Sequence, residues 1–422
     1  MATLRGFVFC MVFGAFSALA HAEGAQIKSF EIKGLDRTRP SVVLRELPFA
    51  EGEFWQESMA AEAERRLRNL GLFSTVIVNA PDEEGRVEIA VRERWSLWLL
   101  PEATRKDNGA SSAGMALTEH NFLGLHHNLR LGYRKDTGKN FSGGGGESYS
   151  ASYLWRRVNA SRLDLEVSGS RGTTIADVFQ NNISIAQFEQ RSNSWGILGR
   201  YYLDETPGEG WSGRLGMTVS QTKSSKLFGP ANITLKDERR HAVQIGTSYV
   251  WKNDHLTWDT GEGFDYLFDI AHKSLGSTYR VYHHSISWYR HVEIGTEKTL
   301  GMRLVGGYVG GEYQLDGLFD IGNRNGFRGY YPGEIQGTAY AYGSLEYRML
   351  LEPGGNLQWV AYADVGHMKA DGLTTLDPVL VGTGTGIRWT LRWLVEGTLR
   401  ADVAYGWATK RMRFYLGTGQ AF

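Results

Sequence analysis

The sequence has little of what several common classes of protein require. Cysteine occurs once in 422 residues, as Cys10, which excludes an internal disulfide framework and a cysteine metal site. Basic and acidic side chains balance at 46 each, so no global basic field is available to bind nucleic acid. Proline is scarce, with 9 residues, and no run of 18 apolar residues follows residue 22. We therefore expect neither a proline-rich disordered chain nor a membrane-spanning helix in that part of the chain.

Glycine and aromatic residues are abundant by contrast. The chain has 53 glycines, and aromatic residues make up 12% of it. Its mean hydropathy of -0.33 is low for a membrane protein. A membrane β-barrel is nevertheless compatible with this value, because every second residue of a barrel strand faces the lumen and can be polar. The composition is therefore compatible with a membrane β-barrel, and it argues against a bundle of membrane helices.

The first 22 residues have the pattern of an export signal. Arg5 precedes an apolar stretch from Phe7 to Ala20, and Ala20-His21-Ala22 is a small-x-small cleavage site. The apolar stretch is short for a membrane span, although a retained N-terminal anchor is the alternative. We expect residues 1–22 to be a signal peptide, so that the exported chain has no thiol.

Residues 26–95 predict a small α/β domain with the order β-α-α-β-β. Thr38 is a suitable cap for the first helix, and Gly71 is a suitable stop for the second. The apolar spacing in the second helix is that of an amphipathic helix, and the last two segments alternate as strands do. The expected elements are a strand over 27–32, a helix beginning near Pro40, a helix over 56–70, and strands over 72–79 and 86–92.

Three segments of this domain resemble a POTRA (polypeptide-transport-associated) domain. They are EIKGLDRT at 31–38, RRLRNLGLFSTV at 65–76 and VRERW at 91–95. POTRA domains are the periplasmic modules of the superfamily that includes BamA, TamA and the two-partner secretion transporters. The resemblance implies an edge strand that can receive a client segment by β-augmentation. A small α/β domain of unrelated descent is the alternative.

From Ser96 onward the sequence alternates with period two, as β-strands do. Between 394 and 406, for example, Leu399 and Val403 share one face while Arg400 and Asp402 share the other. A soluble β-sandwich would alternate similarly, but export and charged polar faces favour a membrane barrel. About sixteen such segments can be counted. We therefore expect a mainly β fold, with residues 96–422 forming a 16-stranded antiparallel transmembrane β-barrel behind the POTRA domain.

Two motifs in the barrel region resemble signatures of the same superfamily. The first resembles a Gly-rich loop with an Arg-Gly-aromatic core that folds back into the barrel lumen, although Asn323 replaces one family glycine. The second resembles an aromatic-x-Asp-x-Gly strand motif. The positions that carry these resemblances are Phe327, Arg328, Gly329 and Tyr330 in the loop, and Tyr362, Asp364 and Gly366 in the strand.

An arginine on a flexible loop and carboxylates on neighbouring strands suggest an internal ion pair. If the alternation holds, Glu346 and Asp364 both point into the lumen. A guanidinium group can bind such a carboxylate with two parallel hydrogen bonds. We predict that Arg328 pairs with Asp364, beside Glu346, and holds the loop inside the barrel. An exposed arginine in an external loop is the alternative, and its surface ion pair would contribute under about 1 kcal/mol.

The last strand ends on an aromatic residue. Phe414, Leu416 and Phe422 are expected to face the same way in an alternating strand. A terminal aromatic after such a strand resembles the signal by which the assembly machinery recognises outer-membrane barrels.

No pattern of catalytic or metal-binding residues emerges from the sequence. No Gly-x-Ser-x-Gly elbow occurs in a strand-turn-helix setting. The histidine pairs at 126–127 and 283–284 are adjacent, and neighbours on a strand point to opposite faces, so they chelate poorly. We expect no enzyme activity, no metal and no cofactor.

The resemblance implies an outer-membrane protein that assists insertion or translocation of polypeptides. Its expected partners are a client polypeptide, outer-membrane lipid and other envelope proteins that reach the POTRA domain. A single POTRA domain and the lack of a plug segment depart from the better-known members. A dedicated secretion pore for one partner protein, or a passive or lipid-handling channel, are therefore alternatives. A pore predicts a lumen lined by Arg303, Arg388, Arg400, Arg411 and Arg413.

Overall fold

The computed structural model describes residues 25–105, 111–137, 146–180, 183–204, 206, 208–313, 317–322, 326–330, 334–369, 379–420 and 422. The expected signal peptide and Asn323 lie outside these residues. No helix within the described ranges is long and apolar enough to cross a membrane.

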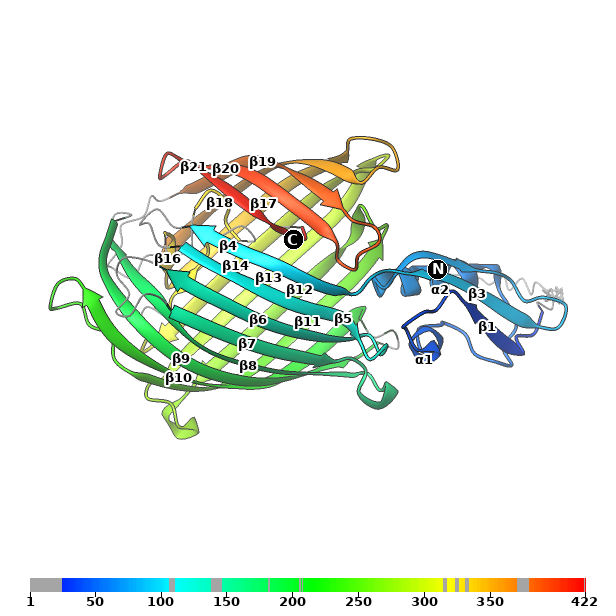
Figure 1. The fold of residues 1–422 in the computed structure, drawn as a ribbon, viewed down its shortest axis with the longest axis horizontal. Helices are drawn as coiled ribbons and strands as arrows, with labels where there is room; N and C mark the ends of the chain where they lie inside the picture. The colour runs from blue at the N-terminus through cyan, green and yellow to red at the C-terminus, as the bar shows by residue number, and fades with distance from the viewer. Residues whose placement is uncertain are drawn as a thin grey trace, which may run out of the picture.

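The N-terminal domain has the predicted β-α-α-β-β order. Its three strands form one sheet in the order β1-β3-β2, in which β1 runs parallel to β3 and β2 runs antiparallel to it. In Figure 1 this domain lies beside one end of the barrel. Its elements are β1 (Ser29–Lys33), α1 (Pro40–Leu44), α2 (Glu57–Asn69), β2 (Phe73–Val78) and β3 (Arg86–Glu93).

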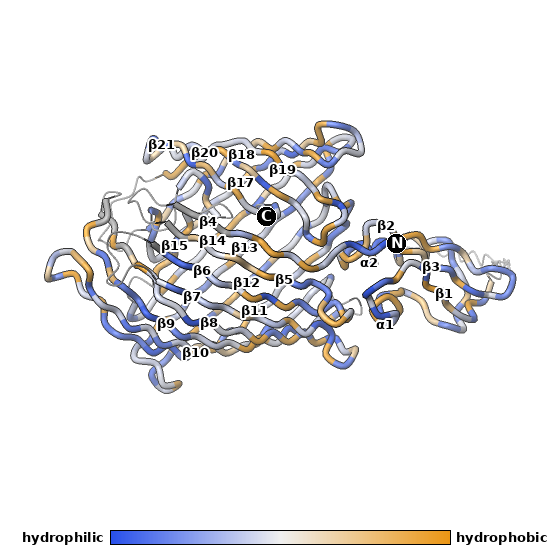
Figure 2. The backbone as a smooth tube through the Cα atoms, in the orientation of Figure 1, coloured by the Kyte–Doolittle hydropathy of each residue, from blue (hydrophilic) through white to orange (hydrophobic). Residues whose placement is uncertain are grey.

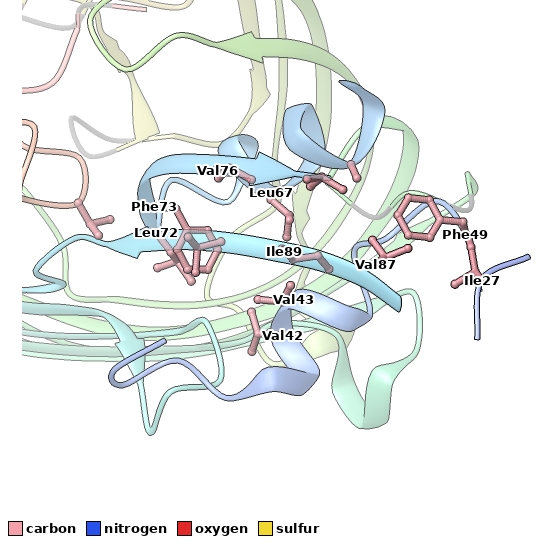
Figure 3. Close-up of a cluster of buried hydrophobic side chains, with 14 residues drawn as sticks. Ile27, Val42, Val43, Phe49, Leu67, Leu72, Phe73, Val76, Val87 and Ile89 are labelled. Atoms are coloured by element: carbon pink, nitrogen blue, oxygen red, sulfur yellow. The ribbon is translucent and has the colours of Figure 1, made fainter. Parts of the chain in front are cut away.

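One hydrophobic cluster holds this small domain together (Figure 3). Ala63 and Leu67 lie on one stripe of α2 and are completely buried, because residues four apart share a helix face. The strands supply their alternate residues, such as Val87 and Ile89 of β3. Burying each such Val, Leu or Ile side chain contributes about 1.5–3 kcal/mol.

The predicted cap of the first helix is wrong. Arg39 occupies the N-cap position of α1 and makes no side-chain cap hydrogen bond. Thr38 instead accepts a hydrogen bond at its Oγ1 from Asn121 Nδ2, which lies 2.8 Å away near the end of a barrel strand. Its backbone N–H donates to the Glu93 carboxylate at 2.9 Å. Thr38 therefore helps to fix the small domain against the barrel.

The predicted 16-stranded antiparallel sheet is confirmed. Every pair of sequential barrel strands is antiparallel, and the sheet begins with β4 and ends with β21. A small pair, β15 (Phe319–Asp320) and β16 (Gln336–Gly337), lies within the connection between β14 and β17. The barrel strands are β4 (Leu97–Arg105), β5 (Ser111–Phe122), β6 (His127–Thr137), β7 (Gly146–Trp155), β8 (Leu163–Gln180), β9 (Ile183–Tyr202), β10 (Gly210–Phe228), β11 (Glu238–Asp254), β12 (Asp259–Ala271), β13 (Val281–Gly295), β14 (Lys298–Gly311), β17 (Ala339–Leu350), β18 (Leu357–Lys369), β19 (Leu380–Thr390), β20 (Thr398–Gly406) and β21 (Arg411–Thr418).

Alternation along the strands separates an apolar outer face from a polar lumen. On β21, Met412 and Phe414 are 57% and 69% exposed, whereas the intervening Arg413 is 3% exposed. Figure 2 shows hydrophobic and hydrophilic residues interleaved along the barrel strands in the same way. A lipid-facing band with a polar interior is the pattern of a transmembrane barrel.

The strands differ greatly in length around the barrel. β8, β9 and β10 have 18, 20 and 19 residues, whereas β4, β20 and β21 have 9, 9 and 8. In Figure 1 the green β9 and β10 extend beyond the other strands at the end of the barrel away from the N-terminal domain. The sheet is therefore shortest where its first and last strands lie.

Candidate functional site: the lumen loop and the seam

The connection between β14 and β17 folds into the barrel. Phe327 in this connection is completely buried. Its ring centroid lies 5.4 Å from that of Tyr342 on β17 and 5.6 Å from that of Tyr330. Aromatic pairs at these separations contribute about 0.5–1.5 kcal/mol beyond the area they bury. We call residues 326–330 the lumen loop.

Arg328 is held by the predicted carboxylate of β18. Its Nε and one terminal nitrogen donate to the two oxygens of Asp364 at 2.9 and 2.7 Å, which is a bidentate pair. The Arg328 backbone N–H also donates to Asp364, at 2.9 Å. Arg328 is 1% exposed and Asp364 is 0% exposed. Such a pair is strongly destabilised when one partner is removed, because the other charge stays buried alone.

A second carboxylate completes the environment of Arg328. Its other terminal nitrogen donates to Glu346 of β17, and Arg348 Nε donates to the same carboxylate at 2.7 Å. The guanidinium carbon lies 3.6 Å from the ring centre of Tyr362, a cation–π contact. The sequence motifs therefore meet at one place, with two arginines facing two carboxylates.

Gly329 occupies a position whose backbone conformation and close packing favour glycine. Its φ is +97°, and an added Cβ would lie 3.0 Å from the backbone of Gly406 on β20. A side chain here would be strained by the backbone conformation and by this contact. Gly366, the last residue of the strand motif, lies opposite Tyr342 in the β17–β18 pair, and an added Cβ would meet that side chain at 2.3 Å.

The lumen loop is also attached to β21. Tyr415 Oη accepts a hydrogen bond from the Gly329 N–H at 3.0 Å and donates to the Tyr330 carbonyl at 2.9 Å. Tyr330 Oη donates to the Val381 carbonyl of β19 at 3.0 Å. The loop therefore binds to the inner face of the C-terminal strands as well as to β17 and β18.

The expectation that the three C-terminal residues share a face is wrong for Phe422. Phe414 and Leu416 point outward and are 69% and 78% exposed. β21 ends at Thr418, and the chain then turns at Gly419, whose φ is +75°. Phe422 lies inside, where its carbonyl accepts a hydrogen bond from Arg348 at 2.8 Å. Whether these residues act as an assembly signal stays a prediction.

The first and last barrel strands define a seam. Within the described residues, β4 pairs only with β5, and β21 pairs only with β20. Figure 1 shows both at the front of the barrel, as the cyan and red ends of the sheet. In the described part of the chain, each strand therefore has one edge without backbone pairing, and other proteins usually cover or blunt such edges.

The chain that leads into β4 is bound to the far side of the seam. Trp95 N–H donates to the Trp393 carbonyl at 2.6 Å, and Val395 N–H donates to the Trp95 carbonyl at 2.9 Å. Trp98 Nε1 donates to the Val395 carbonyl at 2.8 Å. Residues 393–395 belong to the turn between β19 and β20. This contact links the N-terminal domain to the C-terminal strands beneath the seam.

Sequence reasoning missed three of the residues that matter here. In the sequence, Tyr415 is only a polar position on an alternating strand, and Arg348 is only the last residue of the segment SLEYR at 344–348. Glu334 binds Arg413 of β21 at 2.6 Å, and nothing in its local sequence indicates that partner. Within the described residues, no group of three His, Cys, Asp or Glu side chains is placed to hold a metal ion.

Comparisons with known proteins agree with this architecture. The family described as "Omp85 superfamily domain" matches residues 121–422, and the POTRA family, described as "Surface antigen variable number repeat", matches residues 25–94. The outer membrane protein assembly factor BamA of Neorickettsia risticii (strain Illinois) is 29% identical over 121 residues. That match spans 28% of this chain and only 16% of the relative's length.

Two solved structures share the fold at low sequence identity. CdiB from Escherichia coli is 14% identical with a TM-score of 0.61, and the superposition covers 94% of this chain and 74% of that one. BamA from Haemophilus ducreyi lacking POTRA domains 1–3 is 15% identical with a TM-score of 0.54. That superposition covers 93% of this chain and 83% of the BamA chain. The chain belongs to the Omp85 superfamily, with its barrel in the bacterial outer membrane and its POTRA domain in the periplasm.

Proposed function

We propose that the protein assists the insertion of polypeptides into the bacterial outer membrane. The observation that carries the proposal is the seam, where β4 and β21 each lack a second partner strand among the described residues. Unpaired N–H and C=O groups at such an edge can pair with an incoming strand, and no water in the bilayer core competes for them. The backbone, not a catalytic side chain, then performs the function.

The POTRA domain offers a first binding edge for the same client. Among the residues that the structure describes, β2 pairs with β3 alone, and its Ile77 is 48% exposed. An extended polypeptide can add to this edge by β-augmentation, with side-chain contacts giving selectivity. The linker at Trp95 then leads from this domain to the seam. Capture at β2 followed by pairing at the seam is the order that the arrangement supports.

The lumen arginines favour insertion at the seam over a dedicated secretion pore. Arg388 and Arg400 both bind Asp402, each at 2.6 Å, and are 0% and 3% exposed. Arg413 binds Glu334 at 2.6 Å. These three arginines are buried and ion-paired within the wall, two of them sharing one carboxylate, so they do not line an open channel. The lumen loop lies on the same wall.

A reversible covalent lock tests the seam. The only native cysteine, Cys10, lies in the expected signal peptide, so an engineered pair would be unique. We pair Leu99→Cys on β4 with Leu416→Cys on β21 as the seam lock. Ala401→Cys with Leu416→Cys is the matched control, because these two positions are already neighbours in the β20–β21 register. The measurement is the folding of a reporter outer-membrane barrel into proteoliposomes.

We expect oxidation of the seam pair to reduce reporter folding at least about tenfold, and a reductant to restore it. Oxidation of the control pair should leave folding near the wild-type level. Unchanged folding with a fully oxidised seam would contradict the proposal. Quantitative proteomics after depletion separates the alternatives: loss of many barrels supports insertion, whereas loss of one exported protein supports a dedicated pore.

A further inference from the structure

Enclosed space also exists where the POTRA domain meets the periplasmic turns of the barrel. Two adjacent cavities of about 220 and 410 Å³ lie there. They share part of their lining, which includes Asn69 of α2, His126 and Arg156 in barrel turns, and Lys252 of β11. We call the smaller one the junction cavity. Nothing in the proposed insertion mechanism uses it.

The junction cavity is strongly cationic. Its described lining has six cationic side chains and three carboxylates. They come from both domains, so cations of the POTRA domain face cations of the barrel. Like charges in a half-enclosed space repel unless an anion lies between them. The cations are Arg45, Arg66, Arg156, Arg157, Arg200 and Lys252, and the carboxylates are Glu46, Asp164 and Glu209.

The carboxylates of the cavity are already engaged. Arg157 and Arg45 both donate to the same oxygen of Glu46, at 2.7 and 3.2 Å. Glu209 is bound in a bidentate manner by Arg65 of α2, at 2.5 and 2.8 Å. Arg65 lies outside the lining, so this carboxylate neutralises a charge from elsewhere. Two of the cations are likewise paired outside the lining, Arg66 with Glu62 at 2.7 Å and Lys252 with Asp254 at 3.0 Å. The positive excess therefore comes from the other four arginines of the lining, which outnumber the two remaining carboxylates, Glu46 and Asp164.

Arg156 is the clearest sign of a missing partner. Its Nε is buried and has no hydrogen-bond partner among the described residues, and the same is true of Arg157 Nε. No carboxylate of the described residues forms an ion pair with Arg156. Burial, together with the nearby Arg156 and Arg45, holds the pKa of His126 well below its usual value. The ring of His126 is consequently neutral and adds no further positive charge at pH 7.

We propose that the junction cavity binds a phosphoryl group, from free phosphate or from the headgroup of an anionic lipid. Guanidinium groups reach the cavity from α1, α2, the β7–β8 turn and β9. Such a convergent set suits a tetrahedral anion with several oxygens, because each arginine can bind a different pair of them. A planar carboxylate would satisfy only one. The bound anion would join the POTRA domain to the barrel.

The test measures phosphate binding to the full chain in neutral detergent at physiological salt, which screens weak surface binding. Isothermal titration with inorganic phosphate is compared among variants whose fold is verified by their heat-modified mobility in gels. Arg156→Gln removes the unpaired guanidinium. Arg66→Gln removes a cation from the opposite wall and guards against a folding defect in the first variant. Arg191→Gln, at a position 70% exposed on β9, is the matched control.

We expect Arg156→Gln and Arg66→Gln each to weaken phosphate binding about tenfold, the loss of one charge-assisted pair. Arg191→Gln should have no effect. Saturable binding of vesicles containing phosphatidylglycerol but not of phosphatidylcholine vesicles, lost in the same variants, would identify a lipid headgroup as the source. Absence of saturable binding of either probe, or equal binding by all variants, would overturn the proposal.

Discussion

The two walls of the barrel lumen are built from different chemistry. The wall of β17–β21 carries arginines and carboxylates that are nearly inaccessible, including Arg348, Glu346 and Asp364. The opposite wall carries a row of small residues that strand register brings side by side: Gly132, Ser150, Ser170, Ser194 and Ser220 on β6 to β10. Large outward residues such as Trp195, 70% exposed, alternate with this row.

The contrast teaches where the barrel is stiff. Buried ion pairs and the lumen loop fix the C-terminal wall, because breaking one partner leaves a charge without water or counter-charge. The small residues of the serine row make hydroxyl contacts, such as that between Ser170 Oγ and Ser194 Oγ at 2.7 Å. The seam joins β21, part of the fixed wall, to β4, which leads toward the lightly held wall. We expect β4 to move more readily than β21.

The largest effect should come from breaking the buried pair. Arg328→Ala leaves Asp364 and Glu346 without their shared cation, so we expect a loss of about 3–5 kcal/mol. Ser170→Ala on the opposite wall is the control and should lower stability by no more than about 1 kcal/mol. Heat-modified gel mobility and protease cleavage of the 312–338 connection measure both. Equal melting of the two variants would remove the distinction between the walls.

A backbone change tests the fit of the lumen loop. Gly329→Ala forces a side chain into the left-handed region against Gly406, so we expect a loss near the upper end of about 1–3 kcal/mol. Gly354 also has a positive φ, of +63°, but nothing lies within 4 Å of an added Cβ in Gly354→Ala. It should lie near the lower end of that range. If Gly354→Ala destabilises the barrel more, close packing of the loop against β20 is not what matters.

Removing one hydroxyl sharpens the link between loop and β21. Tyr415→Phe leaves the buried Gly329 N–H and Tyr330 carbonyl without this partner, and we expect a loss of about 1–3 kcal/mol. The loop should also be cleaved faster by protease. Tyr149→Phe, on the outer surface of β7 at 53% exposure, should change neither. A protease-resistant loop in Tyr415→Phe would mean that Arg328 alone holds it.

The smallest effect concerns a partly exposed carboxylate of the POTRA domain, Glu62. Hydrogen bonds from Arg65 above all, and from Arg66, lower the pKa of Glu62 below its ordinary 4.5. A lowered carboxylate pKa stabilises the folded domain fully above the ordinary value, and this contribution is lost as pH falls through the folded value. The hydrogen-exchange protection factors of the α2 amides, which correct for slower intrinsic exchange in acid, should therefore fall below about pH 4.5. Glu62→Gln should flatten that dependence; an identical acid profile would refute it.

Much of this architecture could be predicted because it depends on local pattern. Period-two alternation gave the strands, and the 3.6-residue spacing of Ala63 and Leu67 gave α2. The encounter of Arg328 with Asp364 and Glu346 follows from motif resemblance and strand parity, since all three had to point inward. These inferences need only short segments and the rule that neighbours on a strand face opposite ways.

Other contacts could not be predicted, because they depend on how distant segments meet. Thr38 has the residue type and position of a helix N-cap, but its hydroxyl binds Asn121 and does not cap the helix. The alternation of β21 in the sequence predicts that Phe422 faces outward with Phe414. The chain, however, leaves the strand at Gly419, and Phe422 lies in the lumen. The cationic junction cavity combines residues as far apart in the sequence as Arg45 and Lys252. No local pattern indicates that Arg156 would lie there without a counter-charge.

The backbone pairing of Trp95 with the turn at Leu394 has a mechanical consequence. A pulling force on the POTRA domain would not travel along β4 alone. It would divide between β4 and the β19–β20 hairpin, whose turn accepts and donates hydrogen bonds on both sides of Trp95. The linker at Trp95 thus couples the POTRA domain to both sides of the seam, to β4 on one side and to the C-terminal strands on the other. A client that pulls on the POTRA domain would apply force to both sides of the seam at once. Whether the seam opens would then depend on which side gives up its hydrogen bonds first.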